Sequence, residues 1–181
     1  AANRKILECP LVNNKGRYEF DFPSYDKLMT GKEKIVILCS PHNPGGRVWT
    51  EQELKQVADF AQRHDLILIS DEIHHDIVYP GTNHVPMTSV DEKIYDRLLM
   101  MTATTKTFNI AGAHTGNIII PDERLREKFK LKMAALGISP NSFGLFMAKA
   151  AYSPEGAVWV DNLIKYFCIL NYELYQHMSF S

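Results

Sequence analysis

Three short apolar runs recur along the chain, at residues 34–39, 66–69 and 98–101. Their apolar residues are consecutive and do not alternate with polar ones, which is typical of strands in parallel sheets that are buried on both faces. We therefore predict three buried strands. A fourth apolar run, residues 115–120, ends at a proline and predicts one more strand.

Helical periodicity separates and follows these runs. Residues 50–53 read Thr-Glu-Gln-Glu, a capping box that predicts a helix starting there and ending near His64. Its apolar positions share one face: Leu54, Val57, Ala58 and Ala61. Further helices are predicted over 122–133, 142–152 and 155–175. The resulting strand–helix–strand order predicts an α/β fold, a mostly parallel sheet flanked by helices in an α/β/α sandwich.

The N-terminal part has a different pattern. Residues 6–12 and 18–22 are short strand-like pieces, and the turn-forming sequence Asn-Asn-Lys-Gly lies between them at 13–16. Residues 23–29 predict a short helix.

Composition and charge exclude some classes of protein. The 181 residues suffice for one domain with a sizeable core. Twenty basic and 21 acidic residues give no electrostatic basis for binding nucleic acid or an anionic membrane. No apolar run reaches the roughly 20 residues that cross a bilayer. The three cysteines lack CxxC spacing, which favours reduced thiols and a cytoplasmic location.

Each predicted strand ends in a polar cluster. These clusters are residues 40–46, 70–74 and 102–109, and they contain Asn43, Asp71 and Lys106 in that order. Ligands of open α/β sheets bind beyond the carboxyl ends of the strands, so we expect the clusters to converge. An amine, a carboxylate and an amide together favour a bound cofactor that carries the chemistry. We expect Lys106 to lie in a pocket.

These motifs carry a family resemblance that runs from about Ile6 to Tyr166. The chain resembles the large domain of fold-type-I pyridoxal-phosphate enzymes of the class I/II aminotransferase superfamily. Residues 71–74 (Asp-Glu-Ile-His) and 106–112 (Lys-Thr-Phe-Asn-Ile-Ala-Gly) most resemble the cystathionine β-lyase branch, the C–S lyases of the PatB/MalY type. Three separate elements agree in type and order, which makes the resemblance specific.

The resemblance implies a role for each cluster. Lys106 would bond covalently to the aldehyde of pyridoxal 5′-phosphate and act as the catalytic base. Asp71 would pair with the pyridinium nitrogen, and Asn43 would donate to the phenolic oxygen. Taken alone, Lys106 is more often a surface lysine after a strand, and Asp71 is as often a turn or helix-capping residue. Asn43 can also be a turn residue before proline, and both interpretations can hold at once.

Further contacts to the cofactor follow from the same resemblance. His74 would contact the phenolic oxygen, where many aminotransferases have a tyrosine. Thr104 and Thr105 are candidate donors to the phosphate. The chain departs from the family at Ala103, where a phosphate-binding serine is common, and at His114, where aminotransferases usually carry an arginine.

Members of the family are considerably longer than this chain. They carry an N-terminal glycine-containing phosphate loop and a C-terminal small domain with a carboxylate-binding arginine, and neither is found here. We therefore expect a fragment. Residues 1–155 would form part of the cofactor-binding large domain, and 156–181 a helix leading toward a small domain. The resemblance also implies an amino-acid substrate and a homodimeric parent protein.

Several functions remain open at this stage. We predict a pyridoxal-phosphate-dependent C–S β-lyase, with an aminotransferase as the alternative and an inactive fragment as the second alternative. An ATPase would fit the acidic strand end at Asp71 and Glu72, but it requires a GxxxxGK[ST] loop that the chain lacks. A metal site built from His74, His75, Asp76 and His84 is disfavoured because the chain has no HExxH pair. His75 and Asp76 are then surface residues or supports of the site.

Overall fold

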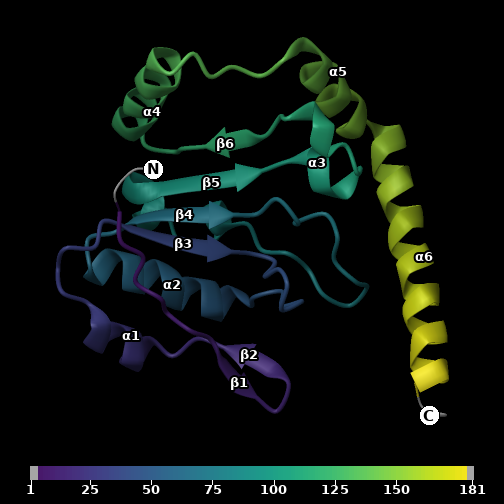
Figure 1. Cartoon of the computed structure of the whole chain (residues 1–181), viewed down its shortest axis with the longest axis horizontal. Coiled ribbons are helices and arrows are strands. Elements are labelled where there is room, and N and C mark those ends of the chain that lie inside the picture. Colours follow the sequence, from purple (N-terminus) through teal and green to yellow (C-terminus); the bar gives the residue numbers. More distant parts are fainter. Residues whose placement is uncertain (1–3, 179–181) are drawn as a thin grey trace.

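The structure, a computed structural model, describes residues 4–178, with side chains up to residue 171. It contains two sheets and a series of helices (Figure 1). The strands are β1 (Val12–Asn14), β2 (Arg17–Glu19), β3 (Ile35–Cys39), β4 (Ile67–Asp71), β5 (Leu98–Thr102) and β6 (Asn117–Ile119). The α-helices are α1 (Phe22–Leu28), α2 (Glu51–Arg63), α3 (Thr104–Thr107), α4 (Glu123–Ala135), α5 (Ser142–Ala151) and α6 (Pro154–Met178). Short 3₁₀ helices are η1 (Met87–Ser89), η2 (Glu92–Arg97) and η3 (Ala111–Ala113).

The main sheet has the strand order β3-β4-β5-β6. The first three strands are parallel, and β6 runs antiparallel to β5. The register pairs Cys39 with Asp71 and Asp71 with Met101, so the carboxyl ends of β3, β4 and β5 lie side by side. The predicted α/β fold with a mostly parallel sheet flanked by helices is confirmed.

Burial divides this sheet into two unequal faces. Alternate residues of the parallel strands pack against α2 and the 3₁₀ helices, and the core they form includes Leu38, Leu54, Leu68 and Leu98. On the opposite face of β3, Ile35 and Ile37 are 55% and 70% exposed. The prediction that residues 34–39 are buried on both faces is therefore wrong, because helix packing among the described residues covers β3 on one face only.

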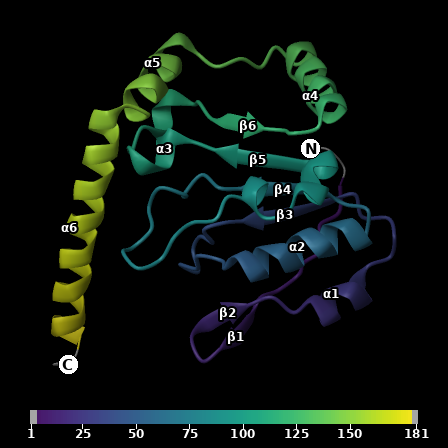
Figure 2. The same cartoon turned by 180° about the vertical axis from the view of Figure 1, so that it is seen from behind.

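The helices surround the sheet without covering it evenly. In both views α4 and α5 lie on the β6 side, and α6 stands beyond the carboxyl ends of the parallel strands (Figures 1 and 2). Helix α6 reaches the rest of the chain through Trp159, whose ring stacks on Phe108 at 5.1 Å between centroids. Farther along α6, the Asn171 side chain donates to the Tyr79 hydroxyl. None of the described helices combines the length and apolarity that a membrane span requires.

The N-terminal hairpin is shorter than predicted. β1 and β2 pair only next to the turn, and Lys15 and Gly16 between them have φ of 52° and 91°. Two successive positive φ values match the tight turn that favours a two-residue hairpin loop. The Asn13 side chain closes this turn by accepting from the Gly16 amide at 2.7 Å. The strand pattern predicted from residue 6 onward is thus ordered as a ladder only from Val12.

The capping box that opens α2 is confirmed. Thr50 Oγ1 accepts from the Glu53 amide at 3.2 Å, and Glu53 Oε2 accepts from the Thr50 amide at 2.8 Å. Glu53 also forms an ion pair with the buried Arg47. Helix α2 supplies the largest helical contribution to the core, so its start fixes how the sheet is covered.

We predict that Thr50→Ala lowers the free energy of unfolding by about 1 kcal/mol, because one helical amide loses its acceptor. Urea denaturation followed by circular dichroism measures this change. Thr50→Ser keeps the hydroxyl and is expected to stay within about 0.5 kcal/mol of the original chain. Equal losses in both variants would show that the methyl group, and not the cap, is responsible.

Candidate functional site

The three polar clusters meet at one edge of the sheet. Asp71 is the last residue of β4, α3 with Lys106 begins two residues after β5, and the Asn43 loop follows β3. Because these strands are parallel neighbours, their carboxyl ends point the same way, toward α6 (Figure 1). The convergence predicted from the strand order is therefore present.

Two of the predicted side chains touch directly. Asn43 Nδ2 lies 3.4 Å from His74 Nε2, although 31 residues separate them in sequence. The amide can only donate here, so the contact requires Nε2 of His74 as the acceptor. Cys39 at the end of β3 contacts the backbone of the Asn43 loop. Its Sγ accepts from the backbone amide of Asn43 at 3.4 Å and donates to the Pro41 carbonyl at 3.3 Å.

Asp71 keeps part of its carboxylate free. The residue is half-buried, and its Oδ1 accepts from the Ile73 amide at 3.3 Å. Its Oδ2 makes no hydrogen bond with any residue in the described range. A carboxylate in this state can accept a bond from a ligand without first giving up a strong protein partner.

Lys106 lies on α3 with its side chain exposed. Residues 4–171 offer it neither an ion pair nor a hydrogen-bond acceptor. The enclosing pocket that we expected around it is not formed, because α3 is a single turn at the outer end of β5 and its covered residues are the neighbours Thr104 and Thr107. Lys106 is therefore reachable from solvent in this structure.

The predicted phosphate donors differ in access. Thr104 is buried and Thr105 is half-buried, so Thr105 is the more accessible of the two hydroxyls. Ala103 is buried before them. His114 lies outside α3, exposed and in the left-handed backbone region with φ of 45°.

The carboxylate next to Asp71 entered the sequence reasoning only through the ATPase alternative, and its burial was not predicted. Glu72 is 1% exposed, and its Oε1 accepts from Ser70 Oγ at 2.7 Å and from the Met87 amide at 3.0 Å. Its Oε2 lies 2.7 Å from His84 Nε2. These contacts tie the segment after β4 to η1. The acidic pair at 71–72 directly after a strand was the available signal, since one carboxylate faces the site and the other is buried.

A second hydrogen-bonded chain also escaped the sequence reasoning. Thr107 Oγ1 donates to Asp76 Oδ2 at 2.9 Å, and Asp76 Oδ1 lies 3.1 Å from His75 Nε2. His75 Nδ1 in turn lies 2.8 Å from the Glu72 carbonyl oxygen. The interpretation of His75 and Asp76 as surface or supporting residues is refined by these contacts: both are half-buried and support α3.

Electrostatics follow from this chain of contacts. The hydrogen bond with Asp76 raises the pKa of His75 above its usual range, and burial opposes that effect. Burial raises the pKa of Asp76, but the bonds from His75 and Thr107 outweigh it and leave the pKa below its usual range. The pair therefore favours an imidazolium beside a carboxylate.

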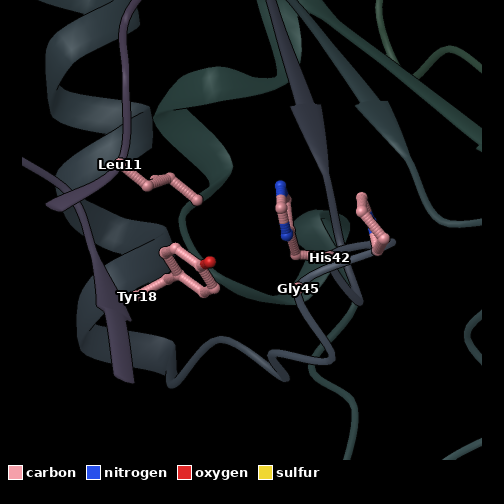
Figure 3. Close-up of a pocket in the computed structure, with 5 residues that line it drawn as sticks. Leu11, Tyr18, His42 and Gly45 are labelled. Atoms are coloured by element: carbon pink, nitrogen blue, oxygen red, sulfur yellow. The ribbon is translucent and has the colours of Figure 1, made fainter. Parts of the chain in front are cut away.

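Two cavities border the site. The larger, about 520 Å³, is lined by Leu11, Tyr18, His42, Pro44 and Gly45, and Figure 3 shows His42 and Tyr18 facing it from the loop after β3 and from β2. The smaller, about 350 Å³, lies between α3 and the start of α6 and includes Asp76 and Phe108 in its lining. Neither cavity contains Asn43, Asp71, His74 or Lys106.

The four residues of the metal-site alternative do not gather around one point. His74 and His84 contact residues outside the set, and His75 and Asp76 contact each other. His84 contacts Glu72, His75 contacts Asp76, and His74 contacts Asn43. Within the residues that the structure describes, no group of three or more histidine, cysteine, aspartate or glutamate side chains is arranged to hold a metal ion.

Both the sequence and the fold of this chain match known proteins. The family described as "Aminotransferase class I and II" matches residues 2–179. Cystathionine beta-lyase PatB of Bacillus subtilis (strain 168) is 38% identical over 165 residues, which are 90% of this chain and 42% of PatB. The chain thus spans less than half the length of this curated relative.

Solved structures give a consistent result. The crystal structure of OvoB matches with a TM-score of 0.91 and 36% identity, over 97% of this chain and 46% of OvoB. Cystalysin from Treponema denticola, whose structure contains a pyridoxal 5′-phosphate cofactor, matches with a TM-score of 0.83 and 41% identity, over 90% of this chain and 41% of cystalysin. The sheet and helices described above are therefore those of a known enzyme fold.

We predict that Asp76→Asn lowers the pKa of His75, because the carboxylate that stabilises the imidazolium is gone. An NMR titration of the His75 ring resonances measures the shift, and His42, which does not contact Asp76, is the internal control. A raised histidine pKa stabilises the fold below the unfolded-state pKa, and this contribution is lost as pH rises through the folded-state value. A His75 midpoint unchanged by Asp76→Asn would contradict the assignment.

Proposed function

This chain belongs to the aminotransferase class I and II family, and from that premise we propose that it is the lysine-bearing part of a pyridoxal-phosphate-dependent C–S β-lyase. One observation carries the proposal. Asn43 and His74, from the ends of two adjacent strands, meet at 3.4 Å beside Asp71 and on the same edge of the sheet as Lys106. This arrangement supports a single site built from all three clusters.

The residues present fit the cofactor in their chemistry. Pyridoxal phosphate, when bound, supplies an aldehyde that reacts with amines and a ring that accepts electrons from the substrate's Cα. Lys106 offers an exposed primary amine, and Asp71 offers a carboxylate oxygen without a protein donor in the described range. The Asn43 and His74 pair offers polar hydrogens to an oxygen ligand. Thr105, and less accessibly Thr104, offer hydroxyls to a phosphate.

Each residue then has a distinct role. Asp71 would pair with a protonated ring nitrogen, so that the ring stays electron-withdrawing. Asn43 would orient and polarise the phenolic oxygen, and His74 would hold the Asn43 side chain in place through their contact. The bond between Asn43 and His74 fixes the two groups in one arrangement, which is the preorganisation that an electrostatic site needs.

Lys106 acts as the base of the reaction. The free amine of Lys106 would remove the proton from Cα of an amino acid that carries sulfur on Cβ. The Cβ–S bond breaks, and the sulfur leaves as a thiolate that takes up a proton. With one water, the remainder yields pyruvate and ammonia. The exposure of Lys106 leaves its amine free to reach the substrate.

Resemblance supports the lyase over its alternative. PatB is named a cystathionine beta-lyase, and Asp71–His74 and residues 106–112 carry the likeness to that branch. Transamination is the second candidate, because the matched family is named for aminotransferases and the same residues would serve that reaction. His114, in place of an arginine, favours the lyase.

The remaining expectations stand as parts of this proposal. Residues 1–155 are proposed to belong to the cofactor-binding large domain, and the segment 156–181, whose described part lies in α6, to lead toward a small domain. The parent protein is homodimeric and cytoplasmic, with an amino-acid substrate. The position of α6 beyond the strand ends is compatible with a helix that leads toward a small domain (Figure 1).

We predict that pyridoxal phosphate followed by borohydride labels Lys106, because its amine is the reactive one of the site. Peptide mapping by mass spectrometry locates the label. Lys106→Ala should remove it, whereas Lys149→Ala, a change at another exposed helical lysine, should leave it in place. Label spread evenly over surface lysines would contradict the proposed site.

We predict that the chain, loaded with pyridoxal phosphate, releases pyruvate and thiol from cystathionine in equal amounts without an oxo-acid acceptor. Coupled lactate dehydrogenase and thiol assays measure the two products. Lys106→Ala should reduce the rate by about 10²–10⁴-fold, the usual loss for a general base. Amino transfer that depends on added 2-oxoglutarate would favour the aminotransferase, and neither product from a labelled chain would favour the inactive fragment.

A further inference from the structure

Helix α3, which carries Lys106, is too short to be stable without contacts to the rest of the chain. It has four residues, and Ala103 before it provides no side-chain cap. A single helical turn is unfavourable in isolation because many backbone angles are fixed for very few hydrogen bonds. The position of Lys106 therefore depends on contacts between α3 and the rest of the chain.

Thr107 makes the polar contact that ties α3 down. It directly follows Lys106, is 2% exposed, and donates its hydroxyl to Asp76 Oδ2 at 2.9 Å. Asp76 belongs to the segment after β4 that also carries Asp71 and His74. One hydrogen bond to a carboxylate thus joins the lysine-bearing turn to the segment that holds the other groups of the site.

Asp76 is itself held in place from the main chain. His75 Nε2 lies 3.1 Å from Asp76 Oδ1, and His75 Nδ1 lies 2.8 Å from the carbonyl oxygen of Glu72. The Glu72 amide donates to the Met101 carbonyl at 2.8 Å, so this anchor is fixed to β5. The chain of contacts runs from the sheet through His75 and Asp76 to α3.

We propose that Asp76 and Thr107 are positioning residues, whose hydrogen bond fixes α3 and so sets the place of Lys106 relative to Asp71 and His74. The fixing of α3 stands on the contacts above, and its catalytic meaning rests on the proposed function. Neither side chain needs to touch substrate or cofactor. Asp76 also lines the 350 Å³ cavity beside α3.

Hydrogen exchange tests the link without any cofactor. The amides of Phe108, Asn109 and Ile110 bond to the carbonyls of Thr104, Lys106 and Thr105 and report on α3. Thr107→Val keeps the shape and removes the donor, and exchange of the peptide spanning 104–110 is expected to quicken by about tenfold or more, the loss expected for a bond to a charged group. Thr107→Ser should restore the original protection.

Two further variants separate the link from a general loss of packing. Asp76→Asn can keep both contacts, accepting from Thr107 through its oxygen and donating to a neutral His75, so it should retain most of the protection. Asp76→Ala cannot, and should match Thr107→Val. Thr88→Val is the matched control, since Thr88 contacts Met100 Sδ at 3.7 Å and not α3. Urea midpoints establish that every variant folds.

Borohydride labelling of Lys106 is then compared across the same variants. We expect Thr107→Val and Asp76→Ala to lower the labelled fraction several-fold, and Thr107→Ser to recover it. Unchanged exchange of 104–110 in Thr107→Val, or no recovery in Thr107→Ser, would overturn the link. Fast exchange in Thr107→Val with an unlabelled parent chain would support the link and overturn the proposed function, so the two can fail separately.

Discussion

Parallel pairing of β3, β4 and β5 is the constraint on which the rest of the structure depends. Their register sets Cys39 beside Asp71 and Asp71 beside Met101, so three loops must leave the sheet at one edge. Each of these loops carries polar residues of the candidate site, among them Asn43, His74 and Lys106. Asn43 and His74 can meet across 31 residues of sequence only because their strands are adjacent, and the site is in this sense a property of strand order.

Much of this arrangement follows from the sequence. The apolar runs predicted the strands, and Thr50 and Glu53 predicted the start of α2. The polar residues at 43, 71 and 106 predicted the edge of the sheet where the loops meet. Periodicity failed where burial depends on neighbours. Residues 34–39 were predicted to be buried on both faces. Ile37 is nevertheless 70% exposed, because the pattern of a strand does not show which elements pack on it.

Side-chain contacts between loops were also beyond sequence reasoning. Asp76 and Thr107 each fit their local sequence without a distant partner. The spacing of 31 residues between them therefore does not predict their hydrogen bond. The burial of Glu72 was missed for a similar reason. Adjacent residues of a strand point to opposite faces, and the sequence does not show that Glu72 lies on the covered face with Ser70 and His84. The residues proposed to face a ligand were thus easier to predict than the residues that hold them in place.

The uncovered face of β3 has a consequence for handling the protein. β3 is the outer strand of the sheet within residues 4–178, and Ile35 and Ile37, both exposed, lie on one face of it. On its outer edge the Cys39 carbonyl accepts from Trp49 Nε1, and the rest of that edge has no partner strand in the described range. Such an edge can accept another extended strand, and burial of the apolar side chains would stabilise the added contact. Chains that meet at high concentration are thus expected to associate through β3, and working solutions will need to be dilute.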